Sequence, residues 1–435
     1  MNNTKTLVNI LEKSITKLKE KREYFKNSET DFTRNRKLNF EKIINILICM
    51  ESGSLKDELY NYFDLNIDNP TSSALIQQRN KIKYEAFEWL LKEFNKETQQ
   101  NKLHNGYKLL AIDGSSIPIC HNIDDKSTYI KQIGKNQKIC KGHNAFHLNT
   151  IYNLLEHTYE DVIIQGEAER DETGAFNSFI DRYNGEKAIY IADRGYESYN
   201  SFAHAIEADQ KFLVRVKDIT SNGILSSFNF NDEEFDLIIK RILTMKQTNE
   251  IKKQKDKYKF MPNNCKFDYI NKDNPYYEIE FRIVRFKLSN GNYECVITNL
   301  SKEEFSSEEI KELYNKRWGI ETSFRELKYA VGMNFFHSKR RDFIKQEIFI
   351  RILFYNFSER IMRCIHPKYK KRIHVYQINF TRAFHMIKTY LKKIKSGIMP
   401  PDIESIIEKE IEPVRPGRSS PRNVRNQMPK FFIYR

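Results

Sequence analysis

The sequence lacks any long hydrophobic run. No stretch of its 435 residues approaches the ~20 apolar residues that a membrane-spanning helix requires, so we expect no membrane partner. The first 25 residues form an amphipathic, lysine-rich pattern without the apolar segment and cleavage site of a signal peptide. We therefore expect an intracellular, cytoplasmic protein.

Paired cysteines are also missing. The six cysteines are scattered, which excludes a disulfide-stapled secreted scaffold and favours free thiols in a reducing compartment. One group contains zinc-binding residue types: Cys120, His121, Cys140, His143 and His147. No second close cysteine pair accompanies it, so its spacing favours other roles, with a structural zinc site as the alternative.

Acidic residues are too few to balance the basic ones. The chain has 73 Lys and Arg against 58 Asp and Glu, a formal net charge of +15. Each phosphate that a basic surface neutralises releases condensed counterions, so this surplus favours binding to a polyanion. It does not identify which polyanion.

What the sequence does contain begins with helices. Residues 1–100 show apolar spacings of three and four throughout and predict an all-helical N-terminal domain. A segment that starts at Pro70 carries five consecutive polar residues: Gln77, Gln78, Arg79, Asn80 and Lys81. This pattern is compatible with a helix-turn-helix DNA reader and equally with a plain helical bundle.

The hydrophobic period then changes to two. Strands are predicted at 107–119, 145–155 and 158–166, followed by alternating helices and strands up to residue 217. This order predicts a mixed α/β sheet over 101–217.

The rest of the chain divides into three parts. Residues 218–295 open polar and lysine-rich and then become strand-like, which predicts a β-rich insertion. Helices return over 296–395 and resume the core. The segment 396–435 ends in a stretch rich in Pro, Ser and Arg, which predicts a basic C-terminal arm.

A narrow polar stripe marks the segment YNKRWGIETSFRELK. On one continuous helix, Tyr314, Arg317, Glu321 and Lys328 fall within roughly 60° of a single face. An apolar stripe runs beside it: Leu313, Ile320, Phe324, Leu327 and Val331. The simpler alternative is an ion pair between Arg317 and Glu321 on a solvated helix.

Two aspartates follow apolar runs. Asp113 comes after KLLAI and Asp193 after AIYIA, and ligands of open α/β sheets gather at strand ends. Alternatively, Asp113 with Gly114 forms a hairpin turn, and Asp193 caps a helix. With Glu321 they make three carboxylates, which repel one another unless a cation lies among them. Mg²⁺ or Mn²⁺ suits such ligands, and two ions together clamp a phosphodiester displacement.

These motifs resemble the DDE transposases of bacterial insertion sequences, specifically the IS4 family with its Tyr-(2)-Arg-(3)-Glu-(6)-Lys signature. Tyr314, Arg317, Glu321 and Lys328 match that signature at every spacing. The segments AIDGS and ADRGY are similar to the family's first and second aspartate segments, and the resemblance covers roughly 105–360.

The resemblance implies an RNase H-like core in which Asp113, Asp193 and Glu321 bind two Mg²⁺ or Mn²⁺ ions. It implies cut-and-paste excision and strand transfer, through hairpin ends, by a homodimer on double-stranded DNA. That DNA would be the terminal inverted repeats and the target, in a bacterial nucleoid, and the helical domain 1–100 would bind the DNA ends. Further DNA contacts are expected from four residues: Tyr314, Arg317, Lys328 and Arg194.

The sequence departs from the family in its tryptophans. Family members can stack a flipped base on a tryptophan in the insertion, but Trp89 and Trp318 both lie outside 218–295. Aromatic residues inside it could substitute: Tyr258, Phe260, Tyr276 and Tyr277. Two other functions stay open, a catalytically silent DNA-binding protein of transposase descent and an RNase H-like nuclease without transposition.

Overall fold

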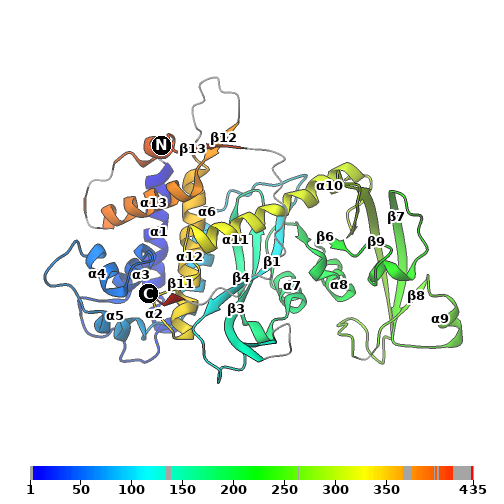
Figure 1. Ribbon diagram of the computed structural model, residues 1–435, viewed down its shortest axis with the longest axis horizontal. Helices are drawn as coiled ribbons and strands as arrows, with labels where there is room; N and C mark the ends of the chain where they lie inside the picture. Colours follow the sequence, from blue (N-terminus) through cyan, green and yellow to red (C-terminus); the bar gives the residue numbers. More distant parts are fainter. Residues whose placement is uncertain are drawn as a thin grey trace.

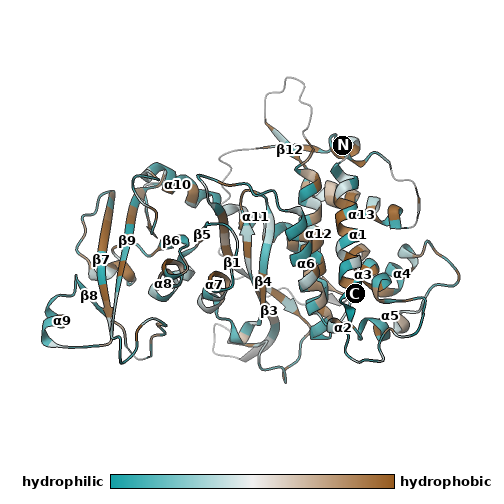
Figure 2. Ribbon diagram, turned by 180° about the vertical axis from the view of Figure 1, so that it is seen from behind, coloured by the Kyte–Doolittle hydropathy of each residue, from teal (hydrophilic) through white to brown (hydrophobic). Residues whose placement is uncertain are grey.

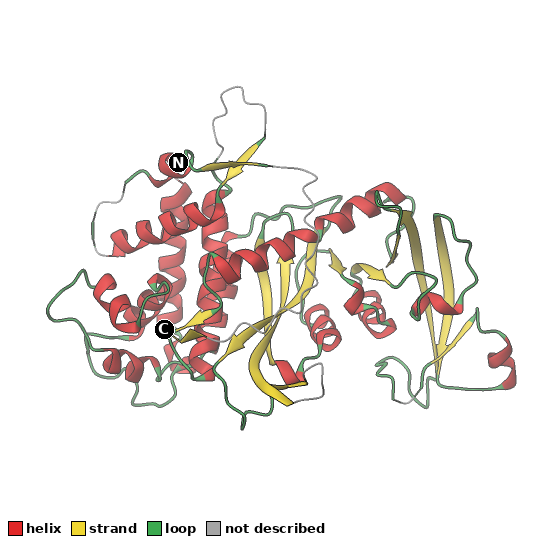
Figure 3. Ribbon diagram, in the orientation of Figure 1, coloured by secondary structure: helices red, strands yellow, loops and turns green. Residues whose placement is uncertain are grey.

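A large mixed sheet forms the centre of the molecule, and helices gather at one end of it (Figures 1 and 3). The computed structural model describes residues 3–133, 139–262, 264–365, 375–395, 397–398, 401–414 and 433–434. The predicted mixed α/β class with a helical N-terminal region is confirmed. Among the helices in these ranges, none combines the length and apolarity needed to span a bilayer.

The sheet has ten strands in the order β2-β3-β1-β5-β6-β10-β9-β7-β8, with β4 paired to β3. They are β1 (Lys108–Ile119), β2 (Tyr129–Ile133), β3 (Ile139–Asn153), β4 (Thr158–Gly166), β5 (Ala188–Ala192), β6 (Lys211–Val216), β7 (Phe235–Thr244), β8 (Tyr258–Phe260), β9 (Tyr276–Lys287) and β10 (Tyr293–Thr298). In its centre, β1, β5 and β6 run parallel. The three strands predicted first are confirmed, whereas β2 was not predicted.

The helices fall into two groups. One group lies at the end of the sheet: α1 (Asn3–Glu20), α2 (Arg22–Phe25), α3 (Phe40–Cys49), α4 (Leu55–Tyr62), α5 (Ser72–Arg79), α6 (Glu85–Thr98), α12 (Arg341–Met362) and α13 (Phe380–Lys395). The other accompanies the strands: α7 (Glu172–Asp181), α8 (Tyr199–Glu207), α9 (Asn249–Lys253), α10 (Ser307–Lys316) and α11 (Trp318–Tyr329).

The N-terminal helices share one hydrophobic core with the C-terminal ones. Both α1 and α6 pack along α12, and α3 also contacts α13. Their apolar residues join those of β1 and β3 in a continuous cluster, and hydrophobic residues mark β1 in the view from behind (Figure 2). Residues distant in sequence therefore build this layer together.

Arg79 is buried, whereas a residue that contacts DNA in a helix-turn-helix domain has to be exposed. Its Nη1 lies 3.0 Å from Glu347 Oε1 on α12. Gln78 is buried as well, because α5 packs its last turn inward. The helix-turn-helix interpretation is therefore wrong for these two side chains.

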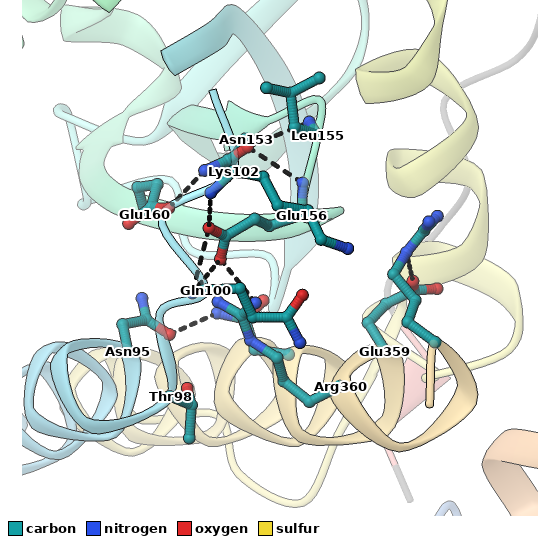
Figure 4. A network of polar contacts seen from close by, with 12 residues as sticks. Asn95, Thr98, Gln100, Lys102, Asn153, Leu155, Glu156, Glu160, Glu359 and Arg360 are labelled. Atoms are coloured by element: carbon teal, nitrogen blue, oxygen red, sulfur yellow. Dashed lines mark hydrogen bonds and ion pairs between the residues drawn. The ribbon is translucent and has the colours of Figure 1, made fainter. Parts of the chain in front are cut away.

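A buried carboxylate fixes the link between the helical layer and the sheet. Glu156, in the β3–β4 turn, accepts hydrogen bonds from the backbone amides of Gln100 and Lys102, each 3.2 Å long (Figure 4). Arg360 of α12 forms an ion pair with it at 2.5 Å. The segment between α6 and β1 is thus held against both α12 and the sheet.

The region 218–295 extends the central sheet. It contains β7, α9, β8 and β9, and β10 then returns to pair with β6, where Cys295 lies opposite Val216. On the other side, β10 pairs with β9. The core sheet and these strands form one continuous sheet.

Short elements complete the chain: β11 (Phe335–Phe336), β12 (Tyr376–Ile378), α14 (Ile403–Ile407), β13 (Ile411–Pro413) and β14 (Ile433–Tyr434). Part of the predicted C-terminal arm is packed, because Ile403 and Ile407 are buried and β13 pairs with β12. Most of its basic segment, 415–432, lies outside the described residues.

Candidate active site

Two aspartates lie on neighbouring parallel strands. Ile112 of β1 pairs with Ala192 of β5, so Asp113 and Asp193 are the next residues on adjacent strands. β5 ends at Ala192, one residue before the predicted end at Asp193, and Asp193 Oδ1 accepts a hydrogen bond of 2.7 Å from the Gly195 amide. The capping role considered for Asp193 is therefore present, in a 3-10 turn.

The alternative of a hairpin turn at Asp113 is wrong. β1 continues for six residues beyond it, with Asp113 opposite Thr150 of the antiparallel strand β3. The following glycine reflects a close approach instead, because a Cβ at Gly114 would lie 2.4 Å from His147 Nε2. A larger residue at position 114 would therefore displace the His147 ring.

His147 is itself held by two carboxylates. Its Nδ1 lies 3.3 Å from Glu167 Oε2, and its Nε2 lies 3.1 Å from Glu172 Oε1. Although burial lowers the pKa of His147, these two neighbours raise it to about 9. Both ring nitrogens therefore face carboxylates of this chain.

The polar stripe lies on two helices, where a single one was predicted. α10 ends at Lys316 and α11 begins at Trp318, because the chain tightens around Arg317 into hydrogen bonds between residues three apart. The apolar stripe is confirmed, since all five of its side chains are buried: Leu313, Ile320, Phe324, Leu327 and Val331.

Arg317 is the centre of this junction. Its Nη2 donates a hydrogen bond of 2.8 Å to Glu321 Oε1, so the predicted ion pair is present. Its guanidinium also lies over the rings of Tyr314 and Trp318, at 5.6 and 5.3 Å from their centroids. Tyr314 and Arg317 are buried, whereas Trp318 is 52% exposed.

Electrostatic interactions connect the helix to the two strands. Burial raises the pKa of Asp113 to about 7, and the charges of Asp193 and Glu321 contribute to the rise. The Gly114 amide and Arg317 act in the opposite direction. Asp193 and Glu321 therefore lie close enough to Asp113 to disfavour the ionised form of its carboxyl group.

The donor set suits a hard divalent cation. Within the described residues, no three His, Cys, Asp or Glu side chains are arranged to hold a metal ion. Glu321 is paired with Arg317, and both aspartates accept backbone hydrogen bonds. A cation among these carboxylates would offset the mutual repulsion that disfavours their ionised forms. Carboxylate oxygens are the ligands that Mg²⁺ and Mn²⁺ prefer.

Several buried polar atoms at the site lack a hydrogen-bond partner in the described structure: Tyr196 Oη, Tyr314 Oη and Arg317 Nε. A buried donor without a partner costs about 1–3 kcal/mol. Oxygen atoms of a bound phosphate would satisfy such donors.

The remaining predicted DNA contacts are placed as follows. Arg194 is exposed, directly after Asp193, and Lys328 is half-buried near the end of α11. Of the insertion aromatics, Tyr276 is 39% exposed, whereas Tyr277 donates a hydrogen bond to Glu207 of α8. Tyr277 is therefore occupied in fixing β9 to the core.

Sequence reasoning missed two residues of this site. Tyr196 is buried three positions after Asp193, and Asp113 and Asp193 add to the rise that burial causes in its pKa. Trp318 lies outside the insertion, where the base-stacking aromatic residue is expected. Both residues lie inside motifs that carry predicted site residues, ADRGY and YNKRWGIETSFRELK. Their position in these motifs could have identified them as residues of the site.

Comparison with known proteins gives two similarities. Residues 104–357 match the family described as Transposase DDE domain. Among solved structures, the chain is similar to the piggyBac transposase synaptic complex with hairpin DNA, determined by cryo-electron microscopy. The TM-score is 0.46 and the identity 10%, over 95% of this chain and 84% of that one. No curated protein matches.

Proposed function

The chain belongs to the Transposase DDE domain family, and from this premise we propose that it excises and inserts a mobile DNA element. It would bind the terminal inverted repeats of an IS4-type insertion sequence, cleave them with Mg²⁺ or Mn²⁺, and join the ends to target DNA. We assign it an RNase H-like core. The observation that carries the proposal is that Asp113 and Asp193 directly follow paired residues of the parallel strands β1 and β5, and that the charges of Asp193 and Glu321 both act on Asp113.

Each residue has a role in this proposal. Asp113, Asp193 and Glu321 would hold two metal ions. When bound there, the ions supply positive charge to the attacking and leaving oxygens of a phosphodiester displacement. To bind a metal ion, Glu321 has to give up its hydrogen bond with Arg317. The Arg317 guanidinium is then free to bind phosphate.

The phosphate is held by residues of both helices. Arg317 and Tyr314 offer unpartnered groups, and Lys328 contributes a point charge further along α11. A guanidinium binds phosphate in a fork geometry, which orients the scissile bond. Arg194, exposed beside Asp193, is placed to contact the DNA backbone.

One such site can cut both strands in sequence. Water attacks phosphorus at the element's end, the P–O3′ bond breaks, and the element keeps a 3′-hydroxyl. That hydroxyl attacks the opposite strand, closes a hairpin on the element and releases the flanking 3′-oxygen, which takes up a proton. Water then attacks the hairpin phosphorus and breaks its bond to the element's 3′-oxygen, which leaves as a hydroxyl. This 3′-hydroxyl attacks a phosphodiester of the target DNA and displaces the target's 3′-oxygen, which takes up a proton. A homodimer would hold the two ends together.

The test replaces each carboxylate separately. Asp113→Ala, Asp193→Ala and Glu321→Ala should abolish cleavage of end DNA in Mg²⁺ or Mn²⁺, while gel-shift affinity persists. Glu312→Ala is the matched control, because Glu312 is an exposed glutamate on the neighbouring helix α10. Cleavage near the wild-type rate in any of the three variants would refute the assignment.

The wild-type protein separates the alternatives. Binding of end DNA without cleavage in either metal would indicate a catalytically silent DNA-binding protein. Cleavage that never joins ends to target DNA would indicate a nuclease. Hairpin-ended intermediates on a denaturing gel support the proposed route, and their absence at every time point would refute it.

A further inference from the structure

Helix α11, which carries Glu321, is fastened to the sheet by a buried hydroxyl pair. Tyr159 Oη of β4 lies 2.7 Å from Ser323 Oγ, and both side chains are buried. Ser323 Oγ donates its own proton to the Ile320 carbonyl at 2.7 Å. The tyrosine is therefore the donor, and its bond reaches a residue two positions after Glu321.

A second hydroxyl holds the next turn of the same helix. Tyr355 of α12 donates a hydrogen bond of 2.9 Å to Glu326 Oε2. Tyr152 Oη of β3 lies 3.2 Å from Tyr355 Oη and completes the chain. The rings pack against each other, with centroids 5.0 Å apart for Tyr152 and Tyr159 and 5.2 Å apart for Tyr159 and Tyr355.

The same strands frame the aspartates. Tyr152 lies opposite Ala111 in the β1–β3 ladder, two positions from the pair of Thr150 and Asp113. At the start of α11, a Cβ at Gly319 would lie 3.1 Å from Cδ2 of Leu154, the residue after β3, so the helix packs closely against the end of this strand. Strand and helix are therefore joined by close packing and by directed bonds.

We infer that Tyr159 and Tyr355 are positioning residues, whose hydroxyls fix the rotation of α11 and so keep Glu321 beside Asp113. The inference rests on the proposed function of Glu321. Apolar packing alone permits a helix to rotate or slide slightly. Two hydrogen bonds one turn apart fix both its rotation and its position along its axis. A displacement of about 1 Å at a catalytic group can cost about 10²-fold in rate.

The test removes one oxygen atom at a time. Tyr159→Phe and Tyr355→Phe should each lower kcat for end cleavage about tenfold, and both together should lower it further. KM for end DNA and gel-shift affinity should stay within about twofold. Calorimetric titration of the DNA-free protein with Mn²⁺ should show weaker binding in both variants, a readout that does not depend on activity.

Two further variants make the outcome decisive. Ser323→Ala removes the Tyr159 bond from its other end, so it should match Tyr159→Phe and add nothing to it. Tyr190→Phe is the control, because that buried hydroxyl on β5 has no partner within the described structure, and its loss should change neither kcat nor Mn²⁺ binding.

The failure of this inference differs from that of the proposed function. If Glu321→Ala abolishes cleavage while Tyr159→Phe, Ser323→Ala and Tyr355→Phe leave kcat and Mn²⁺ binding unchanged, the positioning role is refuted alone. A lower melting temperature with unchanged kcat and Mn²⁺ binding would likewise refute it and leave a purely structural role. If Glu321→Ala cleaves normally, the proposed function itself falls.

Discussion

Trp318 presents half of its side chain to solvent directly beside a buried arginine. The Arg317 guanidinium lies 5.3 Å from its ring centroid, which fixes the indole at the edge of the carboxylate site. An exposed aromatic face can stack a base, and stacking contributes about 1–3 kcal/mol per base. In the proposed hairpin route, an unstacked base near the cleavage point needs such a surface.

We therefore predict that Trp318→Ala slows hairpin formation about tenfold or more, in line with the loss of about 1–3 kcal/mol of stacking. Trp318→Phe, which keeps an aromatic face, should retain most of the rate. Denaturing gels of end-DNA cleavage over time measure both. Tyr24→Ala, an exposed aromatic in the remote helix α2, should behave as wild type. Equal rates in the Ala and wild-type proteins would exclude base stacking on Trp318.

At the scale of elements, α5 and α12 are joined by a buried charge cluster. Arg79 Nε donates to Gln346 Oε1 at 2.7 Å, and Nη1 lies 3.0 Å from Glu347. Glu347 also pairs with His337 and Arg351, each at 3.1 Å. The cluster links the N-terminal helices to the helix that packs behind α11.

Removing Arg79 should be costly for stability. Arg79→Met should lower the free energy of unfolding by about 3–5 kcal/mol, because it breaks a buried ion pair and leaves Glu347 undercompensated. Equilibrium denaturation in urea measures the change. Lys187→Met breaks the exposed pair with Asp209 and should stay within about 0.5 kcal/mol of wild type. A loss below about 1 kcal/mol for Arg79→Met would mean that α5 is held by apolar packing alone.

Glu359 of α12 gives this element a pH dependence. Burial raises its pKa to about 7 from 4.5, with Arg363 opposing the rise and Glu326 adding to it. Between these two values the folded state holds the proton that the unfolded state has released, so stability falls as pH rises. Glu359→Gln removes this loss and should stabilise the protein by about 1–3 kcal/mol at pH 8 and little at pH 4.5.

Urea unfolding of the wild type and of Glu359→Gln across this pH range shows whether stability falls as pH rises. The exposed Glu308 of α10 supplies the control, and Glu308→Gln should not change the slope of stability against pH. If Glu359→Gln instead lowers stability at pH 8, the ion pair between Glu359 and Arg363 in the wild-type protein contributes more than burial of the Glu359 charge costs.

Local patterns predicted some elements well and failed at contacts between distant ones. The apolar stripe through Leu313 and Ile320 was visible because helical spacing alone defines it. The course of β1 through Asp113 was predicted too, but the competing Asp-Gly turn could not be excluded from the sequence, because His147, which occupies the space beside the glycine, comes from another strand. Arg79 looked like a surface residue, since its partner Glu347 lies 268 residues away.

Across the whole molecule, we expect the surplus of positive charge to govern affinity for DNA. With a formal charge of +15, binding to end DNA should weaken with salt along a log–log slope of several units, because phosphate contacts release counterions. Fluorescence anisotropy between about 50 and 200 mM salt measures the slope. Unrelated duplexes of equal length should give a comparable slope at lower affinity. If affinity does not change with salt concentration, the basic surface does not bind the DNA phosphates.

The shared core of early and late helices also has a consequence for biosynthesis. The helices that end at Thr98 are complete long before α12, which begins at Arg341, leaves the ribosome. At about 5–20 residues per second, this interval lasts roughly 10–50 s. Throughout it, α1, α3 and α6 can pack only on one another, the parts of their apolar faces that contact α12 lack that partner, and Arg79 lacks Glu347. The yield of active protein should therefore depend on translation speed and on chaperones that shield the nascent N-terminal segment.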